Sequence, residues 1–168
     1  MIMQLYSEYD ILNGNLASLG NKDEPKQRLA AAEIKFHVEA AARELSLLRF
    51  ANFENELYQN IFSFVTNGEH VRVKFGGILA IRELINCTSA AAEQKVATLA
   101  NTLSNALKSN TDFEIIELIA AALGHMAKSS SVSQVDYVES ELNQALEWLR
   151  DPNTQSIADL HRVQYYSS

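Results

Sequence analysis

The residue types that could carry out covalent chemistry in this chain are one cysteine and four histidines. Cys87 next to a histidine would form the smallest nucleophile pair, in which the imidazole takes the thiol proton. Reactive thiolates also need electropositive surroundings, and no basic cluster stands near Cys87 in the sequence. The histidines are scattered, at His37, His70, His125 and His161. We therefore interpret Cys87 as a small residue in a turn at the end of a helix.

Metal binding and acid–base catalysis have one candidate each. Glu33 and His37 are four residues apart, so a helix would place both on one face, where they could ligate a metal ion. No second pair with complementary ligands is evident, which favours a surface ion pair. An acidic cluster, Glu139, Glu141 and Glu147, could do acid–base work, but a solvated helix face explains it better. The sequence therefore predicts no catalytic residue, no metal site and no cofactor.

Gly76 and Gly77 interrupt an apolar segment. In "VRVKFGGILAIRELI", residues 71–85, the apolar spacing predicts a helix, although each glycine in a helix interior costs about 0.5 to 1 kcal/mol relative to alanine. A phosphate-binding loop is excluded, because the segment has neither G-x-G-x-x-G nor a Walker pattern and follows no strand. We expect instead a close helix crossing, where a neighbouring helix or loop approaches the backbone at both glycines.

The composition is that of one folded domain. The chain has 168 residues, of which 47% are hydrophobic and 21% are charged. No apolar run approaches the roughly 18 residues that cross a bilayer, and the N-terminus shows no secretory signal. The net charge of −7 argues against a broad nucleic-acid-binding face. We expect a soluble protein of the cytoplasm, since a single cysteine also suits a reducing compartment.

Helices account for the whole pattern, and no segment alternates like a strand. Asp23, Glu24 and Pro25 are typical of a helix start, and the Ala- and Leu-rich residues that follow predict a long helix over about 24–48. Short polar breaks, such as Asn67-Gly68 and residues 109–111, separate further segments of similar length. About seven helices result.

Two consecutive helices repeat together along the chain. Leu57 and Ile61 align with Leu99 and Leu103 at an offset of 42 residues, and the same offset places residues 76–85 on 118–127. A third copy, with Leu142, follows at an offset of 39 residues. A two-helix repeat of about 40 residues has the period of HEAT-type units. We therefore predict an all-α fold, an α-solenoid of HEAT-type hairpins, in preference to a plain helical bundle.

The expected hairpins lie at about 3–48, 53–86 and 92–128, with a partial one at 134–150. The solenoid would then occupy residues 1–150 and a divergent tail residues 151–168. Trp148 could anchor an interface, although a core position at the end of a hairpin is more usual. The helix crossing and repeat core are assigned to eight residues: Gly76, Gly77, Leu57, Ile61, Leu99, Leu103, Leu142 and Trp148.

Four blocks of the sequence resemble, in order, the N-terminal HEAT region of the TOR kinases, which are large serine/threonine kinases related to phosphatidylinositol kinases. "KFGGILAIRELI" at 74–85 is similar to the family's K-G-G-I-L-A-I-x-x-L-I, and "FENELYQNIFSFV" at 53–65 to its F-x-x-x-L-x-x-x-I-F-x-L-V helix. "LANTLSNALKSNTDFEIIELIAAALGHMA" at 99–127 resembles the next unit. "YVESELNQALEWLR" at 137–150 resembles Y-V-E-F-E-V-x-x-A-L-E-W-L, and the first helical pair fits more loosely.

The resemblance covers about residues 10–150 and stops after Arg150. Where the family continues with an Arg-rich helix, this sequence has "DPNTQSIADLHRVQYYSS". The sequence contains no glycine-rich nucleotide loop, no HRD and no DFG, which are the marks of a kinase domain. We expect a fragment or truncated gene product without catalysis of its own.

The resemblance implies a scaffold. The family's N-terminal solenoid lies in a complex and contacts an accessory subunit, so the implied partners are a Raptor-like protein and the rest of a TOR complex, in growth and nutrient signalling. A cytoplasmic location, with endomembrane association through that complex, is implied too. The alternative is a free-standing HEAT- or armadillo-type adaptor, which would need a competent C-terminal cap.

Overall fold

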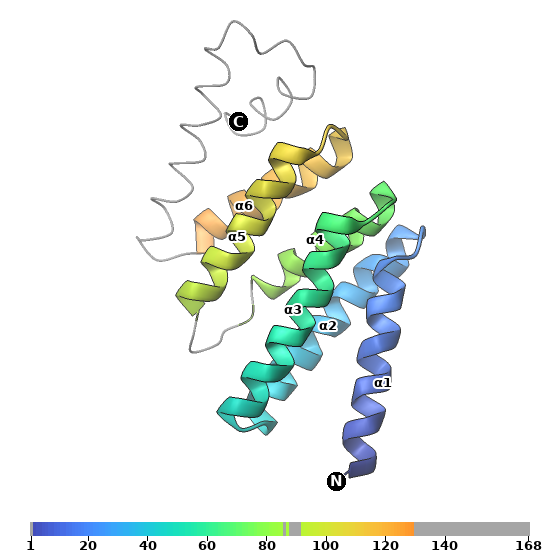
Figure 1. Cartoon of the computed structure of the whole chain (residues 1–168), viewed down its shortest axis with the longest axis vertical. Coiled ribbons are helices and arrows are strands. Elements are labelled where there is room, and N and C mark those ends of the chain that lie inside the picture. The colour runs from blue at the N-terminus through green and yellow to red at the C-terminus, as the bar shows by residue number, and fades with distance from the viewer. Residues whose placement is uncertain (1, 86, 88–91, 130–168) are drawn as a thin grey trace, which may run out of the picture. The chain divides into compact units, whose positions relative to one another are not determined.

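The computed structural model describes residues 2–85, 87 and 92–129, and these residues form helices without any strand. Six helices follow one another in the described ranges (Figure 1). The predicted all-α, helical-repeat class is confirmed, whereas the period of about 40 residues stays a prediction. The helices are α1 (Ile2–Leu19), α2 (Glu24–Glu44), α3 (Leu47–Asn67), α4 (Val71–Leu84), α5 (Ala92–Ser109) and α6 (Phe113–Ser129).

Consecutive helices pair as antiparallel hairpins, α1 with α2, α3 with α4, and α5 with α6 (Figure 1). The chain divides into two compact units, residues 1–90 and 91–168, so that the first two hairpins belong to one unit and the third to the other. None of the described helices is long and apolar enough to span a bilayer. The partial hairpin expected at 134–150 lies outside the described residues.

Helix α4 is the centre of the first unit, because it packs against α1, α2 and α3. Every residue from Phe75 to Ile81 is buried, which explains why this segment is apolar on all sides and shows no polar face. The buried apolar side chains of the other three helices in this unit include Leu12, Leu16, Leu19, Ile34, Val38, Leu57, Ile61 and Val65.

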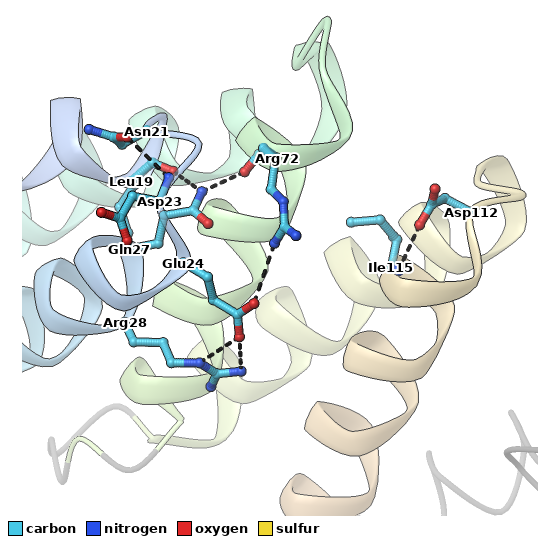
Figure 2. Close-up of polar contacts among 9 residues, drawn as sticks. All are labelled: Leu19, Asn21, Asp23, Glu24, Gln27, Arg28, Arg72, Asp112 and Ile115. Atoms are coloured by element: carbon cyan, nitrogen blue, oxygen red, sulfur yellow. Dashed lines mark hydrogen bonds and ion pairs between the residues drawn. The ribbon is translucent and has the colours of Figure 1, made fainter.

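The second unit is built on the pairing of α5 with α6. Asp112 precedes α6, and its carboxylate accepts a 3.3 Å hydrogen bond from the Ile115 N–H, which is the bond of an N-cap residue (Figure 2). The buried apolar residues follow the helical spacing of three and four on both helices: Leu99, Leu103, Leu107, Ile115, Ile119, Ala122 and Leu123.

The predicted end of the second helix is wrong. Helix α2 stops at Glu44, and the extended residues Leu45 and Ser46 (ψ 151° and 157°) precede α3, so the helix expected over 24–48 is the end of one helix and the start of another. No glycine or proline occurs at this corner, and the apolar spacing continues through it. The sequence therefore gave no sign that Ser46 is the N-cap residue of a new helix. The corner allows α3 to turn away from α2 and pack along α4.

Candidate functional site

The two glycines of α4 lie where two different neighbours reach the helix backbone. A Cβ atom added to Gly76 would overlap the Leu19 carbonyl oxygen and lie 2.9 Å from Nε2 of Gln27. A Cβ atom added to Gly77 would lie 2.8 Å from Cγ2 of Val65. Both glycines are buried. The end of α1 therefore lies against the backbone of α4 at Gly76, and a side chain of α3 lies against it at Gly77.

Gln27 joins the first hairpin to α4. Its buried amide Nε2 donates two 2.6 Å hydrogen bonds, one to the Leu19 carbonyl at the end of α1 and one to the Arg72 carbonyl in the first turn of α4 (Figure 2). The last four carbonyls of a helix have no partner within it, so Gln27 satisfies one of these while it holds α4 in place. Sequence reasoning missed this residue. The signal was a glutamine on the same helix face as Ala30 and Ile34, which are both buried.

Charged side chains cover the same junction on its outer side. Glu24 accepts hydrogen bonds from Arg28 Nη2 at 2.7 Å and Nε at 2.9 Å, and its other oxygen lies 3.5 Å from Nη1 of Arg72 (Figure 2). The hydrogen bonds from Arg28, with the charges of Arg28 and Arg72, lower the pKa of Glu24 below its ordinary value. The Arg72 guanidinium also lies 5.1 Å from the centre of the Phe75 ring. This cluster positions helices rather than a substrate.

Four of the residues assigned to the repeat core are buried, and their equivalence in a repeat stays a prediction. Leu57 and Ile61 of α3 are buried in the first unit, and Leu99 and Leu103 of α5 are buried in the second. Leu142 and Trp148 lie outside the described residues, as do Glu139, Glu141, Glu147 and His161.

Helix α2 also carries apolar side chains on the face turned away from its core. Leu29 and Phe36 are 61% and 63% exposed, and they lie seven residues apart on the side opposite Ile34. Leu47 and Leu48, at the corner where α3 begins, are 88% and 73% exposed. These are the four most exposed large apolar side chains among the residues whose burial the structure describes. Such groups are suited to contact with another protein and offer no reactive chemistry.

Cys87 is half-buried beyond the end of α4, and its surroundings keep the thiol protonated. Burial, together with the nearby Glu39 carboxylate and against the opposing charge of Lys35, raises the pKa of Cys87 to about 11. Burial and the carboxylate of Glu54 likewise raise the pKa of Tyr58. Among the described residues, no histidine is one of the groups that shift the pKa of Cys87, so this part of the chain does not bring together the nucleophile pair considered above.

The Glu33 and His37 pair lies on α2, and the described residues add no further group that could ligate a metal ion with it. No group of three or more histidine, cysteine, aspartate or glutamate side chains in the described part of the chain could hold a metal ion. The His37 ring instead packs edge-on against Phe36, with 6.0 Å between ring centres.

The chain is similar in sequence to several known serine/threonine-protein kinases. It is 38% identical over 135 residues to the serine/threonine-protein kinase tor1 of Schizosaccharomyces pombe, a match that covers 80% of this chain and 6% of that protein. It is 31% identical over 142 residues to the serine/threonine-protein kinase TOR of Arabidopsis thaliana, covering 84% of this chain and 6% of the plant protein. The serine/threonine-protein kinase TOR2 of Saccharomyces cerevisiae is 32% identical over 130 residues, which is 76% of this chain and 5% of the yeast protein.

No family model matches the chain, and no solved structure matches it. The chain spans about 6% of the length of the kinases to which it is similar. Because fungal and plant TOR kinases match along most of its length, the chain is related to one region of the TOR kinases, and the all-helical structure of its described residues fits a HEAT-type region.

Proposed function

We propose that this chain is a protein–protein interaction scaffold, the counterpart of an N-terminal HEAT segment of a TOR-like kinase in growth and nutrient signalling. The observation that carries the proposal is the match itself, which takes in 80% of this chain and only 6% of the S. pombe kinase. The exposed apolar side chains of α2 and of the α3 corner support a role in binding.

Phosphoryl transfer is assigned to parts of the kinases that this chain does not match. A kinase needs a nucleotide loop, a catalytic aspartate and a metal-binding aspartate, and the sequence has none of the motifs that supply them. Incubation of the purified chain with labelled ATP and a general protein substrate should give no labelled product. Labelling above that of a boiled sample would overturn this assignment.

The partners that we propose are a Raptor-like accessory subunit and the remainder of a TOR complex, in the cytoplasm, with residues 1–150 as the scaffold. A binding titration between the purified chain and a purified Raptor-like subunit tests the proposal. The double variant Leu29→Glu/Phe36→Glu should lose binding, because it places two charges on the exposed apolar face of α2. Ile11→Glu, a matched change at a 48% exposed residue of α1, should bind like the parent.

Failure of the parent chain to bind would refute this partner. Equal loss in both variants would indicate a general effect of added charge, and the assignment of the α2 face would be wrong. Reading the transcript across the codon for Ser168 separates the two roles considered above. Further helical repeats in frame would support the kinase segment, whereas a stop there would favour the free-standing adaptor.

A further inference from the structure

Two Asn-Gly pairs occur in the chain, and the structure holds them differently. Asn13-Gly14 lies inside α1, and Asn67-Gly68 lies at the end of α3, with both asparagines exposed. Inside a helix the N–H of Gly14 bonds to the carbonyl four residues earlier. Gly68 comes after the last helical residue, with φ −59° and ψ 117°. It donates none of the backbone hydrogen bonds found in the turns and caps of the described residues.

An asparagine followed by glycine is open to attack by its own backbone, because glycine has no Cβ to hinder the approach. In that reaction the Gly68 nitrogen bonds to Cγ of Asn67, the Cγ–Nδ2 bond breaks, and ammonia leaves with the proton from the Gly68 nitrogen. Water then opens the cyclic imide. Hydrolysis at Cγ leaves aspartate, and hydrolysis at the backbone carbonyl leaves isoaspartate.

We propose that Asn67 is a site of spontaneous deamidation in the folded protein and that α1 protects Asn13 from the same reaction. The attack needs a glycine N–H without a helical acceptor and an asparagine backbone that has left the helical conformation. At Asn67 the first condition is already met, and the second requires only fraying of the last residue of α3, which is a low-energy opening. At Asn13 they require opening of the interior of α1, which breaks several backbone hydrogen bonds together.

The reaction alters the short connection of the second hairpin. Residues 68–70 alone join α3 to α4, and a Cβ atom at Gly68 would lie 2.5 Å from the Phe64 carbonyl oxygen and 3.1 Å from Cγ of Lys74. Isoaspartate adds a methylene to the main chain at this tight turn. Both products also place a negative charge at the C-terminal end of α3, beside Glu69, where the helix dipole disfavours it. We expect the modified hairpin to unfold at a lower temperature.

Ageing the full chain in mildly alkaline buffer at body temperature tests the proposal. Trypsin then releases Asn13 in the peptide 1–22 and Asn67 in the peptide 50–72, and tandem mass spectrometry locates the amide that was lost. Asn67 should react at least about tenfold faster than Asn13 in the folded chain, and the two should react at similar rates in denaturant. Equal rates in the folded chain, or faster loss at Asn13, would overturn the proposal.

The variant Asn67→Gln separates the structural consequence from general ageing, since its longer side chain closes the ring much more slowly. The aged parent chain should have a lower melting temperature than the fresh parent chain. The aged Asn67→Gln variant should have the same melting temperature as the fresh variant. If the aged variant loses as much melting temperature as the parent, the effect assigned to the α3–α4 turn is refuted.

Discussion

The Leu19 carbonyl shows how single residues fix the first unit. It lies against the backbone of Gly76 and accepts a hydrogen bond from Gln27, so one atom at the end of α1 restricts the residue types at two other positions, one of them distant in the sequence. The cost of a glycine inside α4 is offset by this close approach. Exposed glycines of the same helices should behave differently, and the chain provides such a comparison.

Replacing Gly76 by alanine should destabilise the protein by about 1 to 3 kcal/mol, because the added methyl group meets the Leu19 carbonyl and cannot be accommodated without moving backbone. Gly14→Ala is the matched control. Nothing lies within 4 Å of a Cβ atom at Gly14, so alanine should stabilise the helix by about 0.5 to 1 kcal/mol. Urea unfolding followed by circular dichroism measures both. A gain in stability for Gly76→Ala would contradict the close crossing.

Gln27→Leu should cost about 1 to 3 kcal/mol, because the buried Leu19 carbonyl loses its donor and the link from Gln27 to the Arg72 carbonyl is broken. Gln27→Glu should cost more at neutral pH, since a buried carboxylate would face the same two oxygens. Its folded pKa would then be raised, so the extra cost should disappear below the unfolded value of about 4.3. Unfolding curves across acidic pH check this. If the difference in unfolding free energy between Gln27→Leu and Gln27→Glu does not narrow as the pH falls, the role of Gln27 as a hydrogen-bond donor is refuted.

Cys87 should react slowly with thiol reagents at neutral pH, because its raised pKa of about 11 leaves little thiolate in the folded chain. The comparison is the rate in denaturant, where the ordinary pKa applies. The contribution of the protonated thiol to stability is complete below about pH 9 and is lost as the pH rises toward about 11. Equal rates in folded and unfolded chains would show that the thiol is not buried.

At the scale of helices, burial decides which sequence signals are reliable. Helix α4 is enclosed by three others, and its apolar residues run through consecutive positions from Phe75 to Ile81 with no polar face. Helix α2 has a core face and an exposed apolar face, so its amphipathic pattern is weak. The corner at Ser46 falls within such a pattern, which is why it could not be located from spacing.

The N-terminal residues of α3 and α6 allow a matched test of capping. Asp112→Ala should cost about 0.5 to 2 kcal/mol, because it removes the hydrogen bond to the Ile115 N–H. Ser46→Ala should cost less, since the side chain of Ser46 makes no capping bond. Thermal unfolding of the two variants beside the parent compares them. A larger loss for Ser46→Ala would mean that the serine caps α3 in solution.

At the scale of the whole molecule, the chain consists of two compact units, and the first has a complete core of its own around α4. A polypeptide of residues 1–90 should therefore fold alone, with helical circular dichroism and a cooperative thermal transition. Gly76→Ala should lower the transition of this polypeptide as it does that of the full chain. A broad, non-cooperative transition for residues 1–90 would show that the first unit depends on the second.

The sequence alone determined the features that depend on neighbours along the chain. The spacing of apolar residues and the polar breaks predicted an all-α protein of paired helices, and the blocks around Gly76 and Gly77 resemble those of the TOR kinases. Local propensity and periodicity record these features because they act within a few turns of helix. The sequence also predicted a close approach at Gly76 and Gly77, but it did not identify Leu19 and Val65 as the residues that lie against them.

Only the tertiary structure decided which groups meet. Gln27 and Arg72 are 45 residues apart, and neither carries a local sign that the amide of one will hold the carbonyl of the other. The corner between α2 and α3 has the same origin, because it is the position of α4 that requires α3 to change direction there. Long-range packing of this kind places small and polar residues at positions where only the tertiary neighbours explain why those residue types occur.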